Sequence, residues 1–308
     1  MLDNRTITFL TVCEEMNFTR AAEKLHISQP AVTQHIQYIE SYYHVKLFRF
    51  IGKKLLLTDA GKLLRDTLTS IHNNEIYLKE QLTYLTDQRK PLHFGATLTV
   101  GEFMIAQPLS QFLHNYEAAS ITVTVANTNE LLQKLDNGSI DFAILEGDYP
   151  HHLYRHLPYT VENFIPVCSP NYQFTTCPQR YPLTLHDLIE ERLLLREEGS
   201  GTRMILEQSL ACHELNLIDF HNIITIGNMN TIKELVLSAC GITFLYETAV
   251  EKELLTGQIP KIELQDFDVQ HEISIVWKKD NLFEKSLFEL FAQLFGDRVI
   301  SNSGQGKL

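Results

Sequence analysis

The sequence predicts an α+β protein of several domains, in which a small helical domain is followed by one long helix and a larger α/β domain. Three observations predict this organisation. Residues 19–40 have the pattern of two short helices joined by a tight turn. Residues 59–86 form an amphipathic stretch without a proline. From Leu92 onward, short apolar segments alternate with amphipathic ones, which favours βαβ units and a parallel sheet.

Length and composition exclude several classes of protein. A chain of 308 residues with 44% hydrophobic content can form two or three compact domains with cores of their own. No apolar run approaches the roughly 20 residues that a membrane-spanning helix needs. The N-terminus turns acidic at Glu14 and Glu15 and lacks a small-residue cleavage site, so we expect no secretory signal and no membrane partner. We expect a cytoplasmic protein.

The five cysteines, at positions 13, 168, 177, 212 and 240, form no CxxC pair and have no histidine at metal-ligand spacing. We therefore expect reduced thiols, no metal site and no cofactor. A redox pair of Cys168 and Cys177 is disfavoured because no basic residue near them would stabilise a thiolate.

The net charge of −12 is unevenly divided along the chain. Residues 1–90 hold 12 basic and 10 acidic side chains, a balance of +2, whereas residues 91–308 hold 14 basic and 28 acidic ones, a balance of −14. A polyanion would be repelled by the second part, so only the first can meet nucleic-acid phosphates. Any such binding should depend strongly on salt.

A first helix is expected to cover the helical pair with an apolar stripe. The predicted members of this stripe are Ile7, Leu10, Val12 and Met16. In the pair itself, the first helix spans residues 19–25 and buries Ala21, Ala22 and Leu25, the two alanines being small enough for close crossing. The second helix starts at Ser28, an N-cap, with Pro30 in its first turn.

The second helix of the pair has two faces of different chemistry. Its apolar face consists of Ala31, Val32, Ile36 and Ile39. Its polar, uncharged face consists of Gln29, Thr33, Gln34 and Gln37. Amides and hydroxyls at the start of a helix suit base edges and phosphates in a DNA major groove. On the helical pattern alone, an ordinary amphipathic pair is the alternative.

The next segment predicts a β-hairpin with a basic tip. Leu47 and Phe48 anchor the chain, and Gly52 is a turn residue between two short apolar runs. Lys53 and Lys54 at the tip, beside the helical pair, are expected to touch the DNA backbone without reading sequence. This hairpin would be the wing of a winged helix-turn-helix.

AAEKLHISQPAVTQHIQYIE, followed by LF at Leu47 and Phe48, by GKKLLLT and by DAG, resembles the LysR-type transcriptional regulators over nearly the whole chain. Three departures concern the neighbours of these motifs. Met16 and Asn17 stand where the family usually has Gly-Ser, His44 where it has Gly, and Phe50 where it has the arginine that is displaced here to Arg49.

The resemblance implies a sequence-specific regulator of transcription that binds a pseudo-palindromic operator in double-stranded DNA as a dimer or tetramer. RNA polymerase is a further candidate partner. The expected DNA-contacting residues are Thr19, Arg20, Ser28, Gln29, Pro30, Thr33, Gln34, Arg49, Lys53 and Lys54.

Thr58 can cap the long helix over residues 59–86, which would span roughly 40 Å and is too long for packing within a small domain. Apolar residues recur along it at spacings of three and four, as on one face of a coiled coil. They are Leu64, Leu68, Ile71, Leu78, Leu82 and Leu85. We interpret it as a dimerisation helix and expect domains at residues 1–58, 59–90 and 91–308, with DQRKP marking the last boundary.

The α/β part is expected to form two lobes with the architecture of periplasmic binding proteins. Lobe I comprises about residues 91–160 and 268–308, and lobe II about residues 161–267. Strands are predicted at 92–96, 121–127, 141–146, 193–195, 222–226, 241–245 and 271–279, with helices at 102–115, 129–137, after Gly201, after Asn230 and at 282–295. Two crossings between the lobes would make a hinge.

Small polar residues and glycines follow several of these strands, where ligands of such proteins meet helix N-termini. The predicted effector-binding residues are Thr97, Leu98, Thr99, Asn127, Thr128, Gly199, Ser200, Gly201, Thr202, Arg203 and Asn228. Each could instead be only a helix cap. GSGTR, with Arg203, is the strongest anion site, and GATLTVGEF and REEGSGTR resemble effector-site segments of LysR-type regulators. We expect a small anionic metabolite as the effector.

No enzyme motif competes with this interpretation. The sequence contains no GxSxG, P-loop or HExxH, and its 13 histidines are scattered. We therefore expect no catalytic residues. The alternative is a solute-binding or enzymatic α/β domain in which the N-terminal helices serve only assembly.

Overall fold

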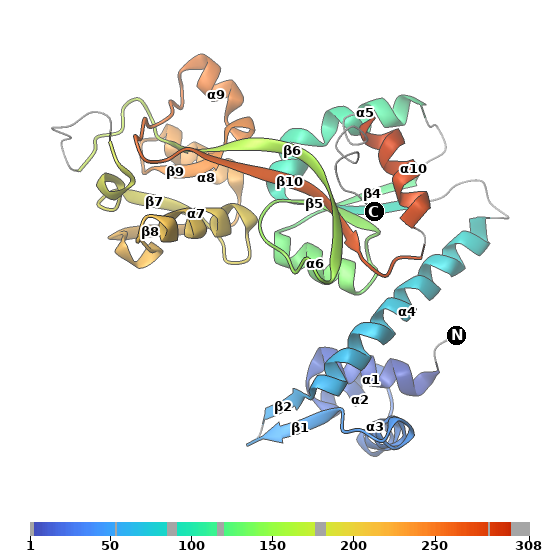
Figure 1. Ribbon diagram of the computed structural model, residues 1–308. Coiled ribbons are helices and arrows are strands. Elements are labelled where there is room, and N and C mark those ends of the chain that lie inside the picture. The colour runs from blue at the N-terminus through green and yellow to red at the C-terminus, as the bar shows by residue number, and fades with distance from the viewer. Residues whose placement is uncertain are drawn as a thin grey trace. The chain divides into compact units, whose positions relative to one another are not determined.

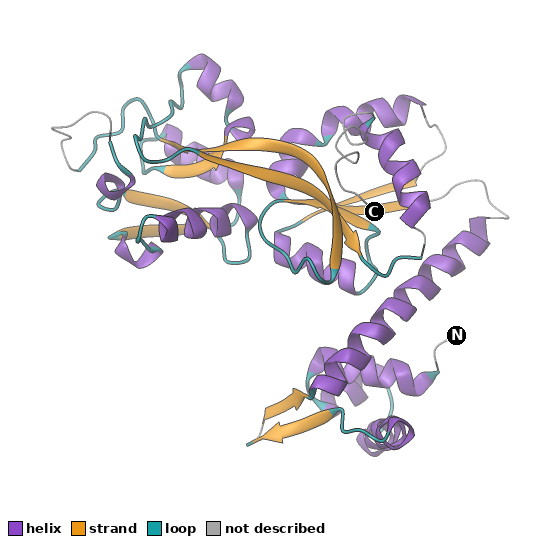
Figure 2. Cartoon of the chain, viewed as in Figure 1, coloured by secondary structure: helices purple, strands orange, loops and turns teal. Residues whose placement is uncertain are grey.

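The computed structural model describes residues 3–52, 54–84, 91–115, 120–175, 183–282 and 284–296. The chain divides into two compact units, one formed mainly by Met1–Gln88 and the other by most of the remaining residues. Within the described residues, no helix is long and apolar enough to cross a membrane. Figure 1 shows the elements of each unit, and Figure 2 marks their helices and strands.

The first unit is a winged helix-turn-helix followed by a long helix (Figure 1). Its elements are α1 (Asn4–Glu15), α2 (Phe18–Leu25), α3 (Gln29–Tyr43), β1 (Phe48–Ile51), β2 (Lys54–Leu57) and α4 (Asp59–Tyr84). β1 and β2 pair antiparallel around Gly52, whose φ of 61° suits a glycine in a tight turn. The predicted wing is therefore confirmed as a hairpin.

The core of this unit confirms the predicted helix pair and all of the stripe predicted for the first helix except Ile7. Its buried residues are Phe9, Val12, Ala21, Ala22, Val32, Ile36, Ile39, Leu47 and Leu55. Ile7, predicted to face this core, is 38% exposed. Met16 lies beyond α1 in the left-handed region, at φ 44°. Val12 is buried in the core, and Leu10 and Met16 are partly buried against it, as predicted; Phe9 is a further buried residue of this helix.

Local hydrogen bonds explain where the helices begin. The Ser28 hydroxyl accepts from the Ala31 N–H at 3.3 Å, which confirms this residue as the N-cap of α3. The Thr58 hydroxyl accepts from the Gly61 N–H at 3.0 Å, as expected for a cap of the long helix. α2 starts one residue earlier than predicted because Asn17 caps it, accepting from Arg20 N–H at 3.1 Å.

The predicted apolar stripe of α4 divides into two parts. Leu64 and Leu68 are partly buried against the helix-turn-helix core, so they stabilise the domain. Ile71, Leu78 and Leu82 are exposed by 47%, 46% and 56%. Leu85 lies outside the described residues. The structure thus leaves only the second part of the stripe free to meet another chain.

The second unit contains two lobes that share a six-stranded sheet. The lobe I elements are β3 (Pro91–Ala96), the π-helix η1 (Val100–Met104), α5 (Ala106–Asn115), β4 (Ser120–Val125), α6 (Thr128–Asp136), β5 (Phe142–Leu145) and α10 (Glu284–Phe295). The single helix predicted over residues 102–115 is two elements, because its first turn is widened to π geometry and interrupted at Ile105.

The remaining elements build lobe II and the connection. Lobe II contains η2 (Leu185–Leu188), β7 (Arg192–Arg196), α7 (Gly201–Cys212), η3 (Leu217–Asp219), β8 (Asn222–Ile226), α8 (Met229–Leu237), β9 (Thr243–Tyr246), η4 (Glu247–Ala249) and α9 (Glu251–Thr256). β6 (Tyr154–Val167) and β10 (Val269–Lys278) are long strands that run through both lobes (Figure 1).

The sheet is mixed, and this corrects the expectation of a parallel sheet. Its strand order is β4-β3-β5-β10-β6-β9. β3 is parallel to β4 and β5, as predicted, and β7 is parallel to β8 in a separate pair. β10, however, is antiparallel to both β5 and β6, and β6 is antiparallel to β9. The two crossing strands therefore connect the lobes as one continuous ribbon.

Candidate functional site

The polar face predicted on α3 lies on the surface of the first unit. Thr19, Arg20, Ser28, Gln29, Pro30, Gln34, Arg49 and Lys54 are exposed, and Thr33 is half-buried. Lys53 lies outside the described residues. Exposure is what a DNA-contacting face requires, and the role of each residue stays a prediction.

Two members of this face hold each other in place. The Gln29 side-chain amide donates to Thr33 Oγ1 at 2.9 Å, and the Thr33 hydroxyl donates to the Gln29 carbonyl oxygen at 3.2 Å. Gln34 is free of such a bond among the described residues and points its amide from an exposed position. Gln34 is therefore the better placed of the two glutamines for direct contact with a base.

The wing is basic and apolar at once. Within the described part of the chain, the side chains of Arg49 and Lys54 are exposed and make no hydrogen bond or ion pair, so both can meet phosphates. Phe50 and Ile51 beside them are 67% and 59% exposed. The sequence analysis did not assign these two apolar residues a role.

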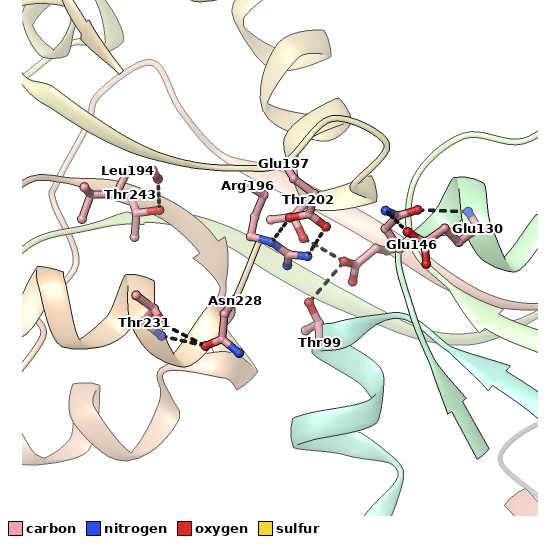
Figure 3. A network of polar contacts seen from close by, with 11 residues as sticks. Thr99, Glu130, Glu146, Leu194, Arg196, Glu197, Thr202, Asn228, Thr231 and Thr243 are labelled. Carbon is pink, nitrogen blue, oxygen red and sulfur yellow. Dashed lines mark hydrogen bonds and ion pairs between the residues drawn. The ribbon is translucent and has the colours of Figure 1, made fainter. Parts of the chain in front are cut away.

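A buried carboxylate links the two lobes of the second unit. Glu146 follows β5 and is 1% exposed. Its Oε1 accepts from the Thr99 hydroxyl at 3.2 Å and from the Thr202 hydroxyl at 2.7 Å (Figure 3). Thr99 belongs to lobe I and Thr202 to the first turn of α7 in lobe II. We call the region formed by Thr97, Thr99, Glu146, Arg196 and Thr202 the lobe junction.

Glycines allow the lobes to approach closely at this point. A Cβ atom added to Gly201 would lie 2.4 Å from the Glu146 carbonyl oxygen, and one added to Gly147 would lie 2.9 Å from the Gly201 Cα. Both contacts are with backbone atoms, which cannot turn away as a side chain can. The Asn129 N–H donates to the Gly199 carbonyl oxygen at 3.4 Å nearby, so backbone also joins the lobes.

Arg196 is the buried cation of the lobe junction. It ends β7, is 3% exposed, and pairs with Glu197 through Nε and Nη2 at 2.8 and 2.9 Å. Both bonds use one edge of the guanidinium group. Figure 3 shows the Arg196 guanidinium and the Glu146 carboxyl group pointing toward one another.

Among the described residues, three buried polar atoms of the lobe junction have no hydrogen-bond partner: Thr97 Oγ1, Glu146 Oε2 and Arg196 Nη1. An unsatisfied buried polar group costs about 1 to 3 kcal/mol, so three in one place indicate a region that is completed by something else. They offer a hydroxyl, an acceptor oxygen and a cationic N–H donor.

The electrostatics of Glu146 follow from this setting. Burial raises the pKa of the Glu146 carboxyl group above its ordinary value, because desolvation disfavours the charged form. The hydroxyls of Thr202 and Thr99, the charge of Arg196 and the nearby hydroxyl of Thr97 oppose this rise and lower the pKa. Burial is the largest of these influences.

Several residues predicted to bind the effector have other partners. Arg203 donates through Nε to Glu207 at 2.8 Å, one helical turn on. Thr128 is fully buried, and its hydroxyl donates to the Glu146 carbonyl oxygen at 2.8 Å. Structural contacts use these groups, and the effector-binding role of both residues stays a prediction.

The two asparagines are helix caps. Asn127 accepts from the Glu130 N–H at 3.0 Å, and Asn228 accepts from the Thr231 N–H at 2.9 Å. Of the other predicted residues, Ser200 is 3% exposed and makes no capping bond to α7 through its side chain. Gly199 has a φ of 86°, and Leu98 is half-buried. Gly201 and Thr202 lie in the lobe junction.

Glu146 and Arg196 were absent from the predicted site, although a signal for both exists in the sequence. Each directly ends or follows an apolar strand, FAIL or LLL, at the same position as Thr97 and Asn127. The rule that selected small polar residues at strand ends would have selected these two charged ones.

Two family models match this chain. The one described as "Bacterial regulatory helix-turn-helix protein, lysR family" matches residues 4–62, and the one described as "LysR substrate binding domain" matches residues 86–299. The chain belongs to the LysR family. It is therefore a DNA-binding transcriptional regulator controlled by an effector.

Curated relatives agree with this LysR-family assignment. The chain is 28% identical to the "HTH-type transcriptional activator CmpR" of Synechocystis sp., covering 96% of this chain and 93% of the relative. It is 26% identical to the "HTH-type transcriptional regulator CysL" of Bacillus subtilis, covering 91% and 93%. Both are named regulators, which argues against the enzymatic alternative.

Solved structures show the same fold. Full-length LysG from Corynebacterium glutamicum has a TM-score of 0.63 at 16% identity and covers 98% of this chain and 99% of its own. The regulatory domain of CcmR from Synechocystis has a TM-score of 0.56 at 14% identity and covers 70% of this LysR-family chain and 98% of its own.

Proposed function

We propose that the lobe junction is the effector site of this regulator and that the effector is a small anion whose acidic group is held by Arg196. The observation that carries this proposal is the buried Nη1 atom of Arg196, for which the described part of the chain supplies no hydrogen-bond partner. Arginine stays protonated in proteins, so this N–H seeks an acceptor, and an anionic oxygen is the strongest one. The neighbouring Thr97 hydroxyl can add a second bond to the same group.

The overall acidity of the second unit does not exclude an anion. The balance of −14 beyond residue 90 acts over long distances and is screened within about 10 Å at 0.1 M salt. Charge-assisted hydrogen bonds at a buried guanidinium are much less screened. Glu197 offsets the charge of Arg196 but occupies only Nε and Nη2. The third nitrogen therefore remains available to the ligand.

The names of two structural relatives agree with a small effector in this fold. The CcmR structure is described as a complex with 2-PG, and the LysG structure as one with bound effector Arg. Those ligands belong to those proteins. They support only the proposal that a domain of this fold holds one small molecule.

At the other end of the regulator, we assign base contacts to Gln29, Thr33 and Gln34, and phosphate contacts to Arg49, Lys53 and Lys54. Thr19, Arg20, Ser28 and Pro30 would orient α3 on the DNA backbone. The described members of this set are exposed except for the half-buried Thr33, and this exposure and the polar character of the first turns of α3 support the assignment.

We propose that two or four copies associate through the exposed part of α4 and present paired α3 helices to a pseudo-palindromic operator in the cytoplasm. An effector changes DNA binding only if it favours one arrangement of the assembly. Because CmpR is named a transcriptional activator, RNA polymerase is the partner that we propose for the output.

The effector site is tested by ligand screening on the full-length chain. Thermal shift followed by calorimetry with acetate, succinate, sulfate and phosphate should find at least one ligand for the unaltered chain. Arg196→Gln should make the binding free energy of that ligand less favourable by about 1.5 to 3 kcal/mol, the usual value of a hydrogen bond to a charged group. Equal binding by both proteins would overturn the site.

Two further variants serve as controls for this test. Arg196→Gln leaves Glu197 unpaired, so a double change of Arg196→Gln and Glu197→Gln removes the pair together and keeps the region neutral. Arg192→Gln is the matched control, because Arg192 lies on the same strand, is exposed, and donates only to the Cys240 carbonyl oxygen at 3.1 Å. It should bind the ligand as the unaltered chain does.

A further inference from the structure

Glu146 is a buried carboxylate that binding of an anion does not explain. An anion needs donors, and an ionised carboxylate has none to offer. The Thr99 and Thr202 hydroxyls both donate to its Oε1, so two donors meet one oxygen. The other oxygen, Oε2, is buried and receives no hydrogen bond.

A structural role accounts for only half of this side chain. The bonds to Thr99 and Thr202 join the two lobes and would be made equally well by the oxygen of a neutral glutamine. A charged carboxylate is costly in this position because burial removes it from water, and this cost is what raises the pKa of Glu146. The unsatisfied Oε2 atom is the part of Glu146 that glutamine would not reproduce.

The partner of Oε2 has to be a donor, and no described group donates a hydrogen bond to this atom. Of the described donors near Glu146, Thr99 and Thr202 bond to Oε1, and Thr128 bonds to its backbone oxygen. The Thr97 hydroxyl also lies near the carboxyl group and, like Oε2, has no hydrogen-bond partner among the described residues. Arg196 faces the same space with Nη1 unpartnered, which needs an acceptor. The same ligand can therefore meet two atoms of the lobe junction. Glu146 Oε2 needs a hydrogen-bond donor, and Arg196 Nη1 needs an acceptor.

We propose that Glu146 is a specificity-determining residue and that the effector is a small acid that also carries a hydroxyl or ammonium donor. This inference rests on the proposed function, since the acidic group of the ligand is the one held at Arg196. The donor of the ligand bonds to Glu146 Oε2. Such a ligand satisfies both open atoms at once, whereas the same acid without its donor leaves a buried carboxylate oxygen unpaired.

The difference in affinity between acids with and without a donor should be large. Binding of an acid without a donor leaves Glu146 Oε2 buried and unpaired. A site built to bond a hydroxyl or amine rejects the analogue that lacks it, since its own buried group then stays unsatisfied. A hydrogen bond to a charged group is worth enough to change affinity roughly 10- to 100-fold. The donor also stabilises the ionised form of Glu146.

The test uses matched acids that differ only at one carbon. We would measure dissociation constants of the full-length chain by calorimetry for succinate, malate and aspartate, and for propionate, lactate and alanine. Within each series, hydrogen is replaced by hydroxyl and then by ammonium. We expect the hydroxy or amino member of a series to bind at least about tenfold more tightly than the unsubstituted acid.

Glu146→Gln is the informative variant. Its oxygen can still accept from Thr99 and Thr202, so the contact between the lobes is kept, but an N–H₂ donor replaces Oε2. We expect the preference for the donor-bearing acid to disappear and the ammonium member to lose more than the hydroxyl member, because the charge is gone. Glu207→Gln, an exposed change at the partner of Arg203, should leave the preference unchanged.

The outcomes separate this inference from the proposed function. If succinate or propionate binds as tightly as its substituted partners and Arg196→Gln weakens it, the anion site stands and the role of Glu146 is overturned. If Glu146→Gln keeps the full preference, the inference is also overturned. If no acid of the panel binds, or Arg196→Gln binds them unchanged, the proposed function fails and the inference fails with it.

Discussion

The Thr202 hydroxyl donates to Glu146 at 2.7 Å and so joins the start of α7 in lobe II to the end of β5 in lobe I. Both residues are buried, with exposed fractions of 2% and 1%. A short bond between two buried groups on different lobes fixes their spacing. The contact therefore sets the arrangement in which an effector finds the region.

The first prediction concerns the stability of this contact against pH. The pKa of Glu146 is raised by burial, so the folded chain without a ligand holds this proton at pH values where the unfolded chain has released it. The contribution of Glu146 to stability is accordingly most favourable below its ordinary pKa of 4.5 and declines as pH rises through the raised value. Glu146→Gln does not titrate and avoids this decline.

We expect the melting temperature of Glu146→Gln, relative to that of the unaltered chain, to increase as the pH is raised from 5 to 8. Differential scanning calorimetry in a series of buffers measures this. Thr202→Val serves as the comparison, because it removes the bond and leaves the carboxyl group, and it should not gain with pH. A constant difference between Glu146→Gln and the unaltered chain at all pH values would show that Glu146 titrates normally.

The second prediction concerns the close approach of the lobes. Gly201→Ala places a Cβ atom 2.4 Å from the Glu146 carbonyl oxygen, where backbone has to move. We expect a loss of about 1 to 3 kcal/mol in stability, the usual cost of overpacking. Gly227→Ala is the control, since its nearest neighbour would be a Glu197 oxygen at 3.8 Å. Chemical denaturation measures both, and equal stabilities would contradict the close contact.

These contacts mark the limit of what the sequence could predict. Ser28, Asn127 and Asn228 are helix caps, and such caps follow from one residue type at one place in a local pattern. The partners of Glu146 lie 47 and 56 positions away, so no local pattern contains them. The bond from Arg203 to Glu207, one turn on, lies within α7 and was not considered when Arg203 was predicted to bind the effector.

The same distinction applies to the fold. The alternation of strands and helices predicted βαβ units, and β3, β4 and β5 form them. The antiparallel course of β10 beside β5 depends on strands from the far end of the chain, so spacing within the lobe could not predict it. The orientation of α1 was likewise set by which residues its neighbours cover.

The third prediction separates the roles of Arg196 and Arg203. Arg203 forms an ion pair with Glu207 on α7, whereas Arg196 leaves one N–H free in the lobe junction. We therefore expect Arg203→Gln to change ligand affinity less than threefold, which corresponds to about 0.6 kcal/mol. Calorimetry with the ligand found for the unaltered chain decides this. A loss at Arg203 larger than that at Arg196 would restore the original assignment.

The fourth prediction concerns DNA. Gln34→Ala should relax sequence preference at one operator position by about 1 to 3 kcal/mol, because an amide that reads a base edge is lost. Lys54→Ala should weaken operator and random DNA alike and flatten the salt dependence. Fluorescence anisotropy at several salt concentrations distinguishes the two. Equal losses by Gln34→Ala on both DNAs would refute its assignment to a base.

The fifth prediction concerns assembly. Leu78 is 46% exposed on α4, and a charge there should disrupt a helix-mediated dimer. We expect light scattering to give a dimer or tetramer for the unaltered chain and a smaller species for Leu78→Glu. Thr69→Glu is the control, because nine residues correspond to two and a half turns and place Thr69 on the opposite side of the helix. A monomeric unaltered chain would refute the role of α4.

The central claim is that an acid held at Arg196 controls DNA binding, and one titration tests it most directly. We would measure the operator affinity of the full-length chain with and without saturating ligand, for the unaltered protein and for the double change Arg196→Gln and Glu197→Gln. We expect the ligand to shift the affinity of the unaltered protein by about 5- to 150-fold and that of the double variant by less than twofold. Equal shifts in both proteins would contradict the claim.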